Sequence, residues 1–227
     1  MPIQISNIST ADIPGAVDCI QRAFADDPYY RWVFHPTDQF SKTRNSHSLS
    51  IRIRWGMEHA LFHVAKDTSS TEPDKVIGVA CWLPPSNHKV PQSWHSYFGD
   101  WWLWWEQVKM NIWHGRGGLN TKRYYIWKAA QAEAQKALWT DKNGYYFCNI
   151  VTVSPEAQGK GVGKLLFKYV TDKADIEGRN CYLESSRAEP NMAIYNRMGF
   201  KLGKEMICDD SGDAITLNCM MREPQSS

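Results

Sequence analysis

The chain has 227 residues, 43% of them aliphatic, aromatic or cysteine, which is enough for one domain with a substantial core. Its formal net charge of +2 favours neither nucleic acid nor a membrane surface as a partner. The start, MPIQISNIST, lacks the basic and apolar segments of a signal peptide, so a cytoplasmic location is expected. The six cysteines have no paired or ligand-like spacing, which predicts reduced thiols and no metal site.

The N-terminal part alternates strand-like and helix-like patterns. Residues 3–8 predict a short strand, and the apolar spacing in ADIPGAVDCIQRAFADD predicts a helix. A further helical region is expected up to Trp55. Two strands, HALFHVAKD and KVIGVACWLPP, then follow, and the polar loop TSSTEPD predicts that they form a hairpin.

The next segment, SWHSYFGDWWLWWEQVKMNIWHG, carries an apolar stripe at helical spacing, formed by Trp94, Phe98, Trp101, Trp105, Val108 and Ile112. In the simplest interpretation this stripe packs against the core. In a second, Trp101, Trp102 and Trp105 form an aromatic wall over a substrate pocket. A membrane-surface helix is a third interpretation, which the acidic Asp100 and Glu106 on the opposite face disfavour. After the break GRGGLN, an alanine-rich helix is expected.

From Tyr145 onward the predicted elements alternate between strands and helices. Strands are expected at 145–153 and 181–185, helices at 159–176 and 190–198, and two closing strands around 202–207 and 214–221. Hairpin and crossover units in one chain are typical of an α/β domain with a mixed sheet. We therefore expect a single domain over residues 1–227, with residues 86–144 as a helical insertion.

A glycine-rich turn joins the strand that ends near Val153 to the following helix, and its alternate glycines are Gly159, Gly161 and Gly163. It is not a Walker loop, because Gln158 replaces the first glycine and Leu165 the Ser or Thr. It also lacks the third glycine of a dinucleotide fingerprint. The unpaired backbone N–H groups at the start of the helix, next to Lys160 and Lys164, could bind a pyrophosphate without a metal ion. A connection that binds no ligand is the alternative.

Two motifs in this order, VTVSPEAQGKGVG and CYLESSRAEPNMAIYNRMGF, resemble the signature blocks of the GCN5-related N-acetyltransferase (GNAT) superfamily. Gln158, Gly161 and Gly163 occupy the signature positions of the first block. The second block, which ends in Tyr-x-x-x-Gly-Phe, is most similar to that of puromycin-type acetyltransferases. The resemblance covers residues 145–202 and implies the GNAT fold: a twisted, mixed, mostly antiparallel sheet with splayed central strands, flanked by helices.

The resemblance implies acetyl-CoA (coenzyme A) as the cofactor and residues 145–202 as the core that binds it. The pyrophosphate would lie on the glycine turn, and the pantetheine arm would extend the strand that ends at Val153. The implied coenzyme-binding residues are Val151, Thr152, Val153, Gln158, Gly159, Lys160, Gly161, Val162, Gly163, Lys164, Asn191 and Tyr195. The family more often has this asparagine seven residues before the tyrosine, where the present chain has Ala188.

Two catalytic side chains are also implied by the resemblance. Glu184, in the strand segment YLESS, would take the proton of the acceptor amine, directly or through a water. Its alternative roles are a partner for substrate charge and a structural carboxylate. Tyr195 would return a proton to the departing thiolate, and the N–H of Val151 or its neighbour would stabilise the oxyanion.

The expected function is transfer of an acetyl group from acetyl-CoA to a primary amine, by direct attack in a ternary complex. The tryptophans of the acceptor-side segment 86–144 favour a small, apolar or aromatic metabolite, drug or toxin over a highly charged acceptor. The alternatives are acetylation of a protein N-terminus or lysine, and a non-catalytic acyl-CoA-binding module. We expect a monomer or homodimer with no nucleic-acid or membrane partner.

Overall fold

The computed structural model describes residues 2–69, 71–72, 74–85 and 94–225. Its frame is a seven-stranded sheet in the order β1-β2-β3-β4-β5-β7-β6. The strands are β1 (Ile3–Asn7), β2 (Leu61–Asp67), β3 (Val76–Leu83), β4 (Tyr145–Val153), β5 (Asn180–Ser185), β6 (Lys201–Asp210) and β7 (Asp213–Arg222). Among the described strands only the β4–β5 pair is parallel, so the expected mixed, mostly antiparallel sheet is confirmed.

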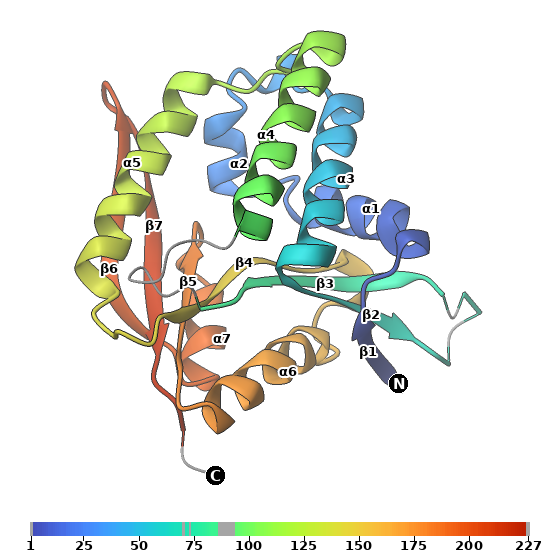
Figure 1. Cartoon of the computed structure of the whole chain (residues 1–227), viewed down its shortest axis with the longest axis vertical. Coiled ribbons are helices and arrows are strands. Elements are labelled where there is room, and N and C mark those ends of the chain that lie inside the picture. The colour runs from blue at the N-terminus through green and yellow to red at the C-terminus, as the bar shows by residue number, and fades with distance from the viewer. Residues whose placement is uncertain (1, 70, 73, 86–93, 226–227) are drawn as a thin grey trace.

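Helices cover both faces of this sheet (Figure 1). On one side are α1 (Ile13–Ala23), α2 (Pro28–Val33), α3 (Lys42–His59), α4 (Trp94–His114) and α5 (Thr121–Leu138). On the other side are α6 (Val162–Ile176) and α7 (Asn191–Arg197). Short 3-10 turns stand at η1 (Thr10–Asp12), η2 (Thr37–Gln39) and η3 (Pro155–Ala157). Helix α4 packs along the outside of α3 rather than on the sheet.

Strand alternation gives the sheet a separate core on each face. In β5, Leu183 packs into the cluster beneath α6 and α7, whereas its neighbour Tyr182 packs into the aromatic cluster beneath α2 and α5. In β4, Val151 and Val153 contact the α6 cluster, and Ile150 contacts the cluster beneath α1 and α3. The central strands are thus covered on both faces, and the candidate site lies at their edges and ends.

The cysteines form no disulfide, and all six are buried. Cys81, Cys148, Cys181 and Cys219 lie in β3, β4, β5 and β7, as their apolar neighbours in the sequence predicted. Burial raises the pKa of the Cys81 thiol to about 12 and that of Cys181 also to about 12. These thiols therefore behave as small core residues.

The tryptophan-rich segment is helical as expected, but its stripe does not pack against the core. Trp101 and Trp105 are 56% and 50% exposed, and Ile112 is 74% exposed. The core-packing interpretation is therefore wrong for these residues, because α4 turns a more polar side toward α3. The side chains of Trp94 and Phe98 lie outside the described part of the structure. In the described ranges, none of the helices has both the length and the hydropathy that crossing a bilayer requires.

Candidate active site

Strands β4 and β5 separate midway along their length. Their parallel pairing ends where Cys148 lies opposite Leu183. At the same point the register between β3 and β4 shifts by one residue, which leaves Asn149 as a bulge in β4. A bulge bends its strand, so β4 turns away from β5 beyond Cys148 (Figure 1). The splayed central strands implied by the sequence are present.

Beyond the bulge, one edge of β4 faces the gap between the strands. The N–H of Ser154 donates to a carbonyl of β3 at 2.9 Å, which fixes the direction in which successive backbone groups point. By alternation, the N–H and C=O groups of Val153 and Val151 point away from β3. The Val153 carbonyl accepts a hydrogen bond from the Gln158 side chain at 3.3 Å. These groups can pair with an extended chain that lies in the gap.

The glycine turn places backbone amides at the beginning of α6. This helix starts at Val162 with Gly161 as its N-cap, later than the expected start at Gly159. Gly159 and Gly161 have φ angles of 74° and 82°, which glycine adopts at low cost. Among the described residues, none accepts a hydrogen bond from the backbone N–H groups of residues 159–164. A Cβ atom at either glycine would have no neighbour within 4 Å, so the turn faces open space.

The surroundings of this turn favour an anion. Lys160 and Lys164 are exposed beside it, and the helix dipole adds partial positive charge at the same end. The start of α6 adjoins the end of β4, because a Cβ at Gly163 would lie 3.7 Å from Val153. Val162 is buried and anchors the turn. The amides and the open β4 edge therefore form adjoining surfaces that fit a diphosphate joined to an extended amide chain.

Glu184 lies one residue beyond the last pair of β4 and β5, with its side chain beneath α5. The amide of Gln131 donates to both carboxylate oxygens, at 3.1 and 2.9 Å. The hydroxyl of Tyr182 donates to Oε1 at 2.9 Å. Burial raises the pKa of Glu184, and the hydrogen bonds from Gln131 and Tyr182 offset this only in part. A carboxylate with a raised pKa is a better proton acceptor than an exposed one.

Tyr195 of α7 packs against the cluster that contains Cys148 and Leu183, the last pair of β4 and β5. Its ring packs against Phe167 and Phe200, with centroids 5.5 and 6.3 Å apart. Burial raises the pKa of the Tyr195 phenol, and its neighbours Cys148 and Asp27 raise it further. The hydroxyl therefore keeps its proton at neutral and at moderately alkaline pH, as a proton donor must.

Two of the implied coenzyme ligands have other partners in the structure. Asn191 donates to the hydroxyl of Ser185 at 3.2 Å and so ties α7 to the end of β5. The hydroxyl of Thr152 lies 3.7 Å from the sulfur of Cys19 in α1. By strand alternation the backbone of Thr152 also faces β3 rather than the gap. The geometry therefore favours Val151 and Val153 over Thr152 as ligands.

A buried carboxylate that the sequence did not single out lies near the same end of β5. Asp27 caps α2 by accepting from the N–H of Tyr30 at 3.1 Å, and it also accepts from the hydroxyl of Ser186. The carbonyl of Asp26 accepts from Arg187. These bonds hold the turn between α1 and α2 against the residues that follow β5. In the sequence, an aspartate before a proline indicates only a helix start.

Comparison with known proteins gives a consistent result. Residues 121–202 match the family model for an acetyltransferase (GNAT) domain. An uncharacterized N-acetyltransferase of Schizosaccharomyces pombe (strain 972) is 26% identical over 96% of this chain and 83% of its own length. Arylalkylamine N-acetyltransferase 2 from Aedes aegypti superposes with a TM-score of 0.61 at 16% identity, covering 99% of this chain and 100% of its own. PaiA N-acetyltransferase from Thermoplasma acidophilum, in complex with coenzyme A, gives 0.51 at 14% identity, with 98% and 99% covered.

The matched region extends beyond the motifs recognised in the sequence. It begins at the first residue of α5, which supplies Gln131 to Glu184, and it continues through β4, the glycine turn and β5. The yeast relative and the solved structures also align with the N-terminal half, so α1 to β3 belong to the same fold. Residues 121–202 thus match the GNAT acetyltransferase domain, and the chain as a whole has the fold of the N-acetyltransferases named above.

Proposed function

We propose that the protein transfers the acetyl group of acetyl-CoA to the primary amine of a small, apolar or aromatic molecule. The observation that carries this proposal is the adjoining of two backbone surfaces, the β4 edge that faces the gap and the free amides at the start of α6. Residues 159–164 would hold the pyrophosphate, and Val151 and Val153 the pantetheine arm. Bound acetyl-CoA supplies the acetyl group as an activated thioester.

The residues around the gap support direct transfer in a ternary complex. Cys148 is the cysteine at the point of separation, and burial raises the pKa of its thiol well above the usual value. A thiol that keeps its proton is a poor nucleophile, which disfavours an acyl-cysteine intermediate. Glu184 would accept the proton of the amine, and Tyr195 would donate one to the departing thiolate.

The turn between α1 and α2 supports a small acceptor. Its Asp26 and Asp27 are bonded to Arg187 and Ser186, which follow β5. A polypeptide acceptor that crossed this edge would have to displace these bonds, whereas a small amine need not. Protein acetylation is therefore the second candidate.

A thiol-release assay with acetyl-CoA tests the function directly. The acceptors are aromatic and aliphatic primary amines, the hydroxyl compounds of matching shape, and peptides with a free N-terminus or a lysine. We expect thiol release and a new amide with the aromatic amines. Turnover with peptides alone would assign the protein to the second candidate. Binding of acetyl-CoA without turnover of any acceptor would indicate a non-catalytic module.

Replacement of Glu184 by glutamine should lower turnover by about 10²- to 10⁴-fold. A base acts when deprotonated, so the wild-type rate should rise with pH through the pKa of Glu184. Because burial raises that pKa, this rise should lie above the ordinary carboxylate range. The measurement is the pH dependence of kcat, and Glu184→Gln should lack the rise.

A matched variant, Tyr182→Phe, keeps the carboxylate but removes one hydrogen bond to it. That bond lowers the pKa of Glu184, so its loss should move the rise in kcat to higher pH. If neither Glu184→Gln nor Tyr182→Phe alters the rise, Glu184 is not the base.

We also propose that Asp27 is the counter-charge for the acceptor ammonium. It is buried, it lies by the end of β5, and its charge acts on Tyr195. Asp27→Asn should raise the KM for the amine about tenfold or more and leave the KM for acetyl-CoA unchanged. Asparagine keeps the size of the side chain and can cap α2.

The control variant is Asp26→Asn, because Asp26 is an exposed carboxylate paired with Arg31. Equal effects of the two variants would exclude the role of Asp27.

A further inference from the structure

Helix α4 contacts α3 through polar side chains as well as through the buried Met110. Asn111 accepts a hydrogen bond from the guanidinium of Arg44 in α3 at 2.7 Å. Gln107, one turn earlier, accepts from the hydroxyl of Ser48 at 3.1 Å, and its amide donates to the Ser48 carbonyl at 3.4 Å. A helix on the surface of a globular protein normally buries its apolar stripe and leaves its polar residues in water. In α4 polar side chains share the contact with Met110, and most of the tryptophans point away from it.

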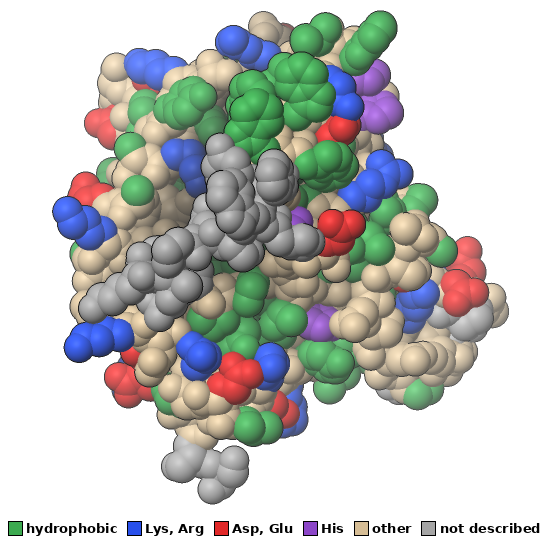
Figure 2. Space-filling model, in the orientation of Figure 1, with side chains coloured by type: hydrophobic (Ala, Val, Ile, Leu, Met, Phe, Trp, Pro, Cys, Tyr) green, Lys and Arg blue, Asp and Glu red, His purple; other side chains and the backbone are tan. Residues whose placement is uncertain are grey.

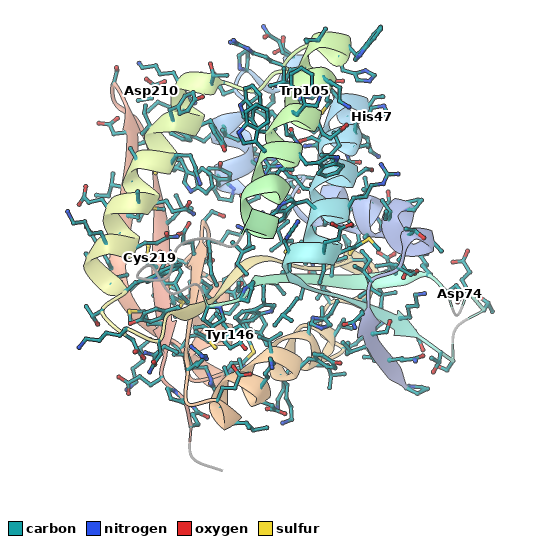
Figure 3. All side chains as sticks on the ribbon, in the orientation of Figure 1. His47, Asp74, Trp105, Tyr146, Asp210 and Cys219 are labelled. Carbon is teal, nitrogen blue, oxygen red and sulfur yellow. The ribbon has the colours of Figure 1, made fainter. Side chains whose placement is uncertain are left out.

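The outward side of α4 carries several large, exposed apolar side chains. We call it the tryptophan face, and it consists of the exposed residues Trp101, Trp102, Trp104, Trp105, Ile112 and Trp113. The ring centroids of Trp101 and Trp104 lie 5.6 Å apart, and those of Trp104 and Trp105 lie 6.2 Å apart. Figure 2 shows hydrophobic side chains gathered over α4, and Figure 3 places Trp105 on the part of α4 distant from the sheet. Large clustered apolar side chains in water indicate a surface that is covered in use.

Positive charge borders this face. A groove of about 290 Å³ between α3 and α4 is lined by Trp113 together with Arg54 and Lys109. Its acidic member, Glu106, pairs with Lys109. In the sequence, α3 carries four Lys or Arg and one Glu, and residues 101–128 carry five and one, although the net charge of the whole chain is only +2. Like Lys109, Lys122 and Arg123 are paired, with Asp210 and Asp213 of the β6–β7 hairpin. Arg54 and Arg116 remain as exposed cations on α3 and directly after α4.

We propose that the tryptophan face docks on an anionic lipid surface. Indole suits the boundary between acyl chains and headgroups, because its ring is apolar and its N–H can reach a polar partner. The bordering cations would attract anionic headgroups, whereas they would oppose the approach of a second copy of the same face. Helix α4 then lies on the bilayer with α3 behind it and does not span it.

This proposal assigns Trp101, Trp102 and Trp105 to a lipid contact instead of the wall of an acceptor pocket. It also departs from the expectation that the protein has no membrane partner. That expectation rested on the charges of α4 itself, notably Glu106. The structure instead sets Arg54 of α3 beside Trp113 in the groove between the two helices.

Vesicle co-sedimentation of the full chain tests the proposal. The probes are vesicles of phosphatidylcholine alone and of an equal mixture of phosphatidylcholine and phosphatidylserine. We expect binding to the mixed vesicles that weakens as salt is added, because salt screens the bordering cations. The double variant Trp101→Ser/Trp105→Ser should bind about tenfold more weakly, since it loses two apolar rings at the contact.

The control variant is Ile176→Ser/Ile207→Ser, which removes exposed apolar side chains on α6 and β6. It should bind the mixed vesicles like the wild type. Because all four substituted residues are exposed, both variants should keep the wild-type melting temperature. Absence of vesicle binding, or equal binding by the two variants, would overturn the proposal. Self-association that the tryptophan substitutions abolish, without vesicle binding, would assign the face to a second copy and also overturn it.

Discussion

Replacement of Gly161 by alanine is expected to weaken acetyl-CoA binding at least about tenfold. Gly161 has a φ of 82°, so a side chain there costs about 1 to 2 kcal/mol in backbone conformation. Apart from its two chain neighbours, none of the described residues has an atom within 4 Å of the new Cβ. It would instead occupy the space in which we place the diphosphate. Calorimetric titration with coenzyme A measures the loss.

Gly178 provides a closely matched control at the other end of α6. It has a φ of 62°, and a Cβ atom there would also have no neighbour within 4 Å. Gly178→Ala should therefore lower the melting temperature about as much as Gly161→Ala and leave coenzyme affinity unchanged. Equal loss of affinity in both variants would mean that strain in α6 is responsible. Unchanged affinity in Gly161→Ala would remove the amides at this turn as the pyrophosphate site.

The sequence predicted those parts of the fold that depend on short-range patterns. In α6 the spacing predicts a buried stripe of five residues, and Val162, Leu166 and Val170 are buried as expected. The prediction is wrong for Leu165 and Tyr169, which are exposed. The same rule failed for α4, although its stripe is just as regular. The difference comes from hydrogen bonds such as Arg44 to Asn111, which join residues 67 positions apart. A local pattern shows which side of a helix is apolar, but not whether that side finds a partner.

The residues of the candidate site show the same difference between local motifs and long-range contacts. The glycine turn and Tyr195 could be recognised because each lies within a compact motif. The bulge at Asn149, which opens the gap, has no composition signal, since it arises from the pairing of β4 with β3. Asp27 reaches Ser186 across 159 positions, and Gln131 reaches Glu184 across 53. Such pairs follow from the sheet order, and the motifs alone do not define it.

Replacement of Tyr195 by phenylalanine is expected to lower kcat by about 10²-fold or more and to leave the affinity for acetyl-CoA nearly intact. The phenyl ring would keep its contacts with Phe167 and Phe200, so the packing of α7 should not change. Only the proton for the departing thiolate would be lost. Stopped assays of thiol release, with coenzyme titration on the same samples, separate turnover from binding.

The pH profile and a second tyrosine distinguish this role from a structural one. Burial raises the pKa of Tyr195, so the wild-type rate should not fall through the alkaline range in which an ordinary phenol ionises. Tyr169→Phe, an exposed residue of α6 that contacts His63, removes a hydroxyl that we give no part in the reaction and should leave kcat unchanged. Equal kcat in wild type and Tyr195→Phe would require another proton source, and the thiolate would then have to depart toward water.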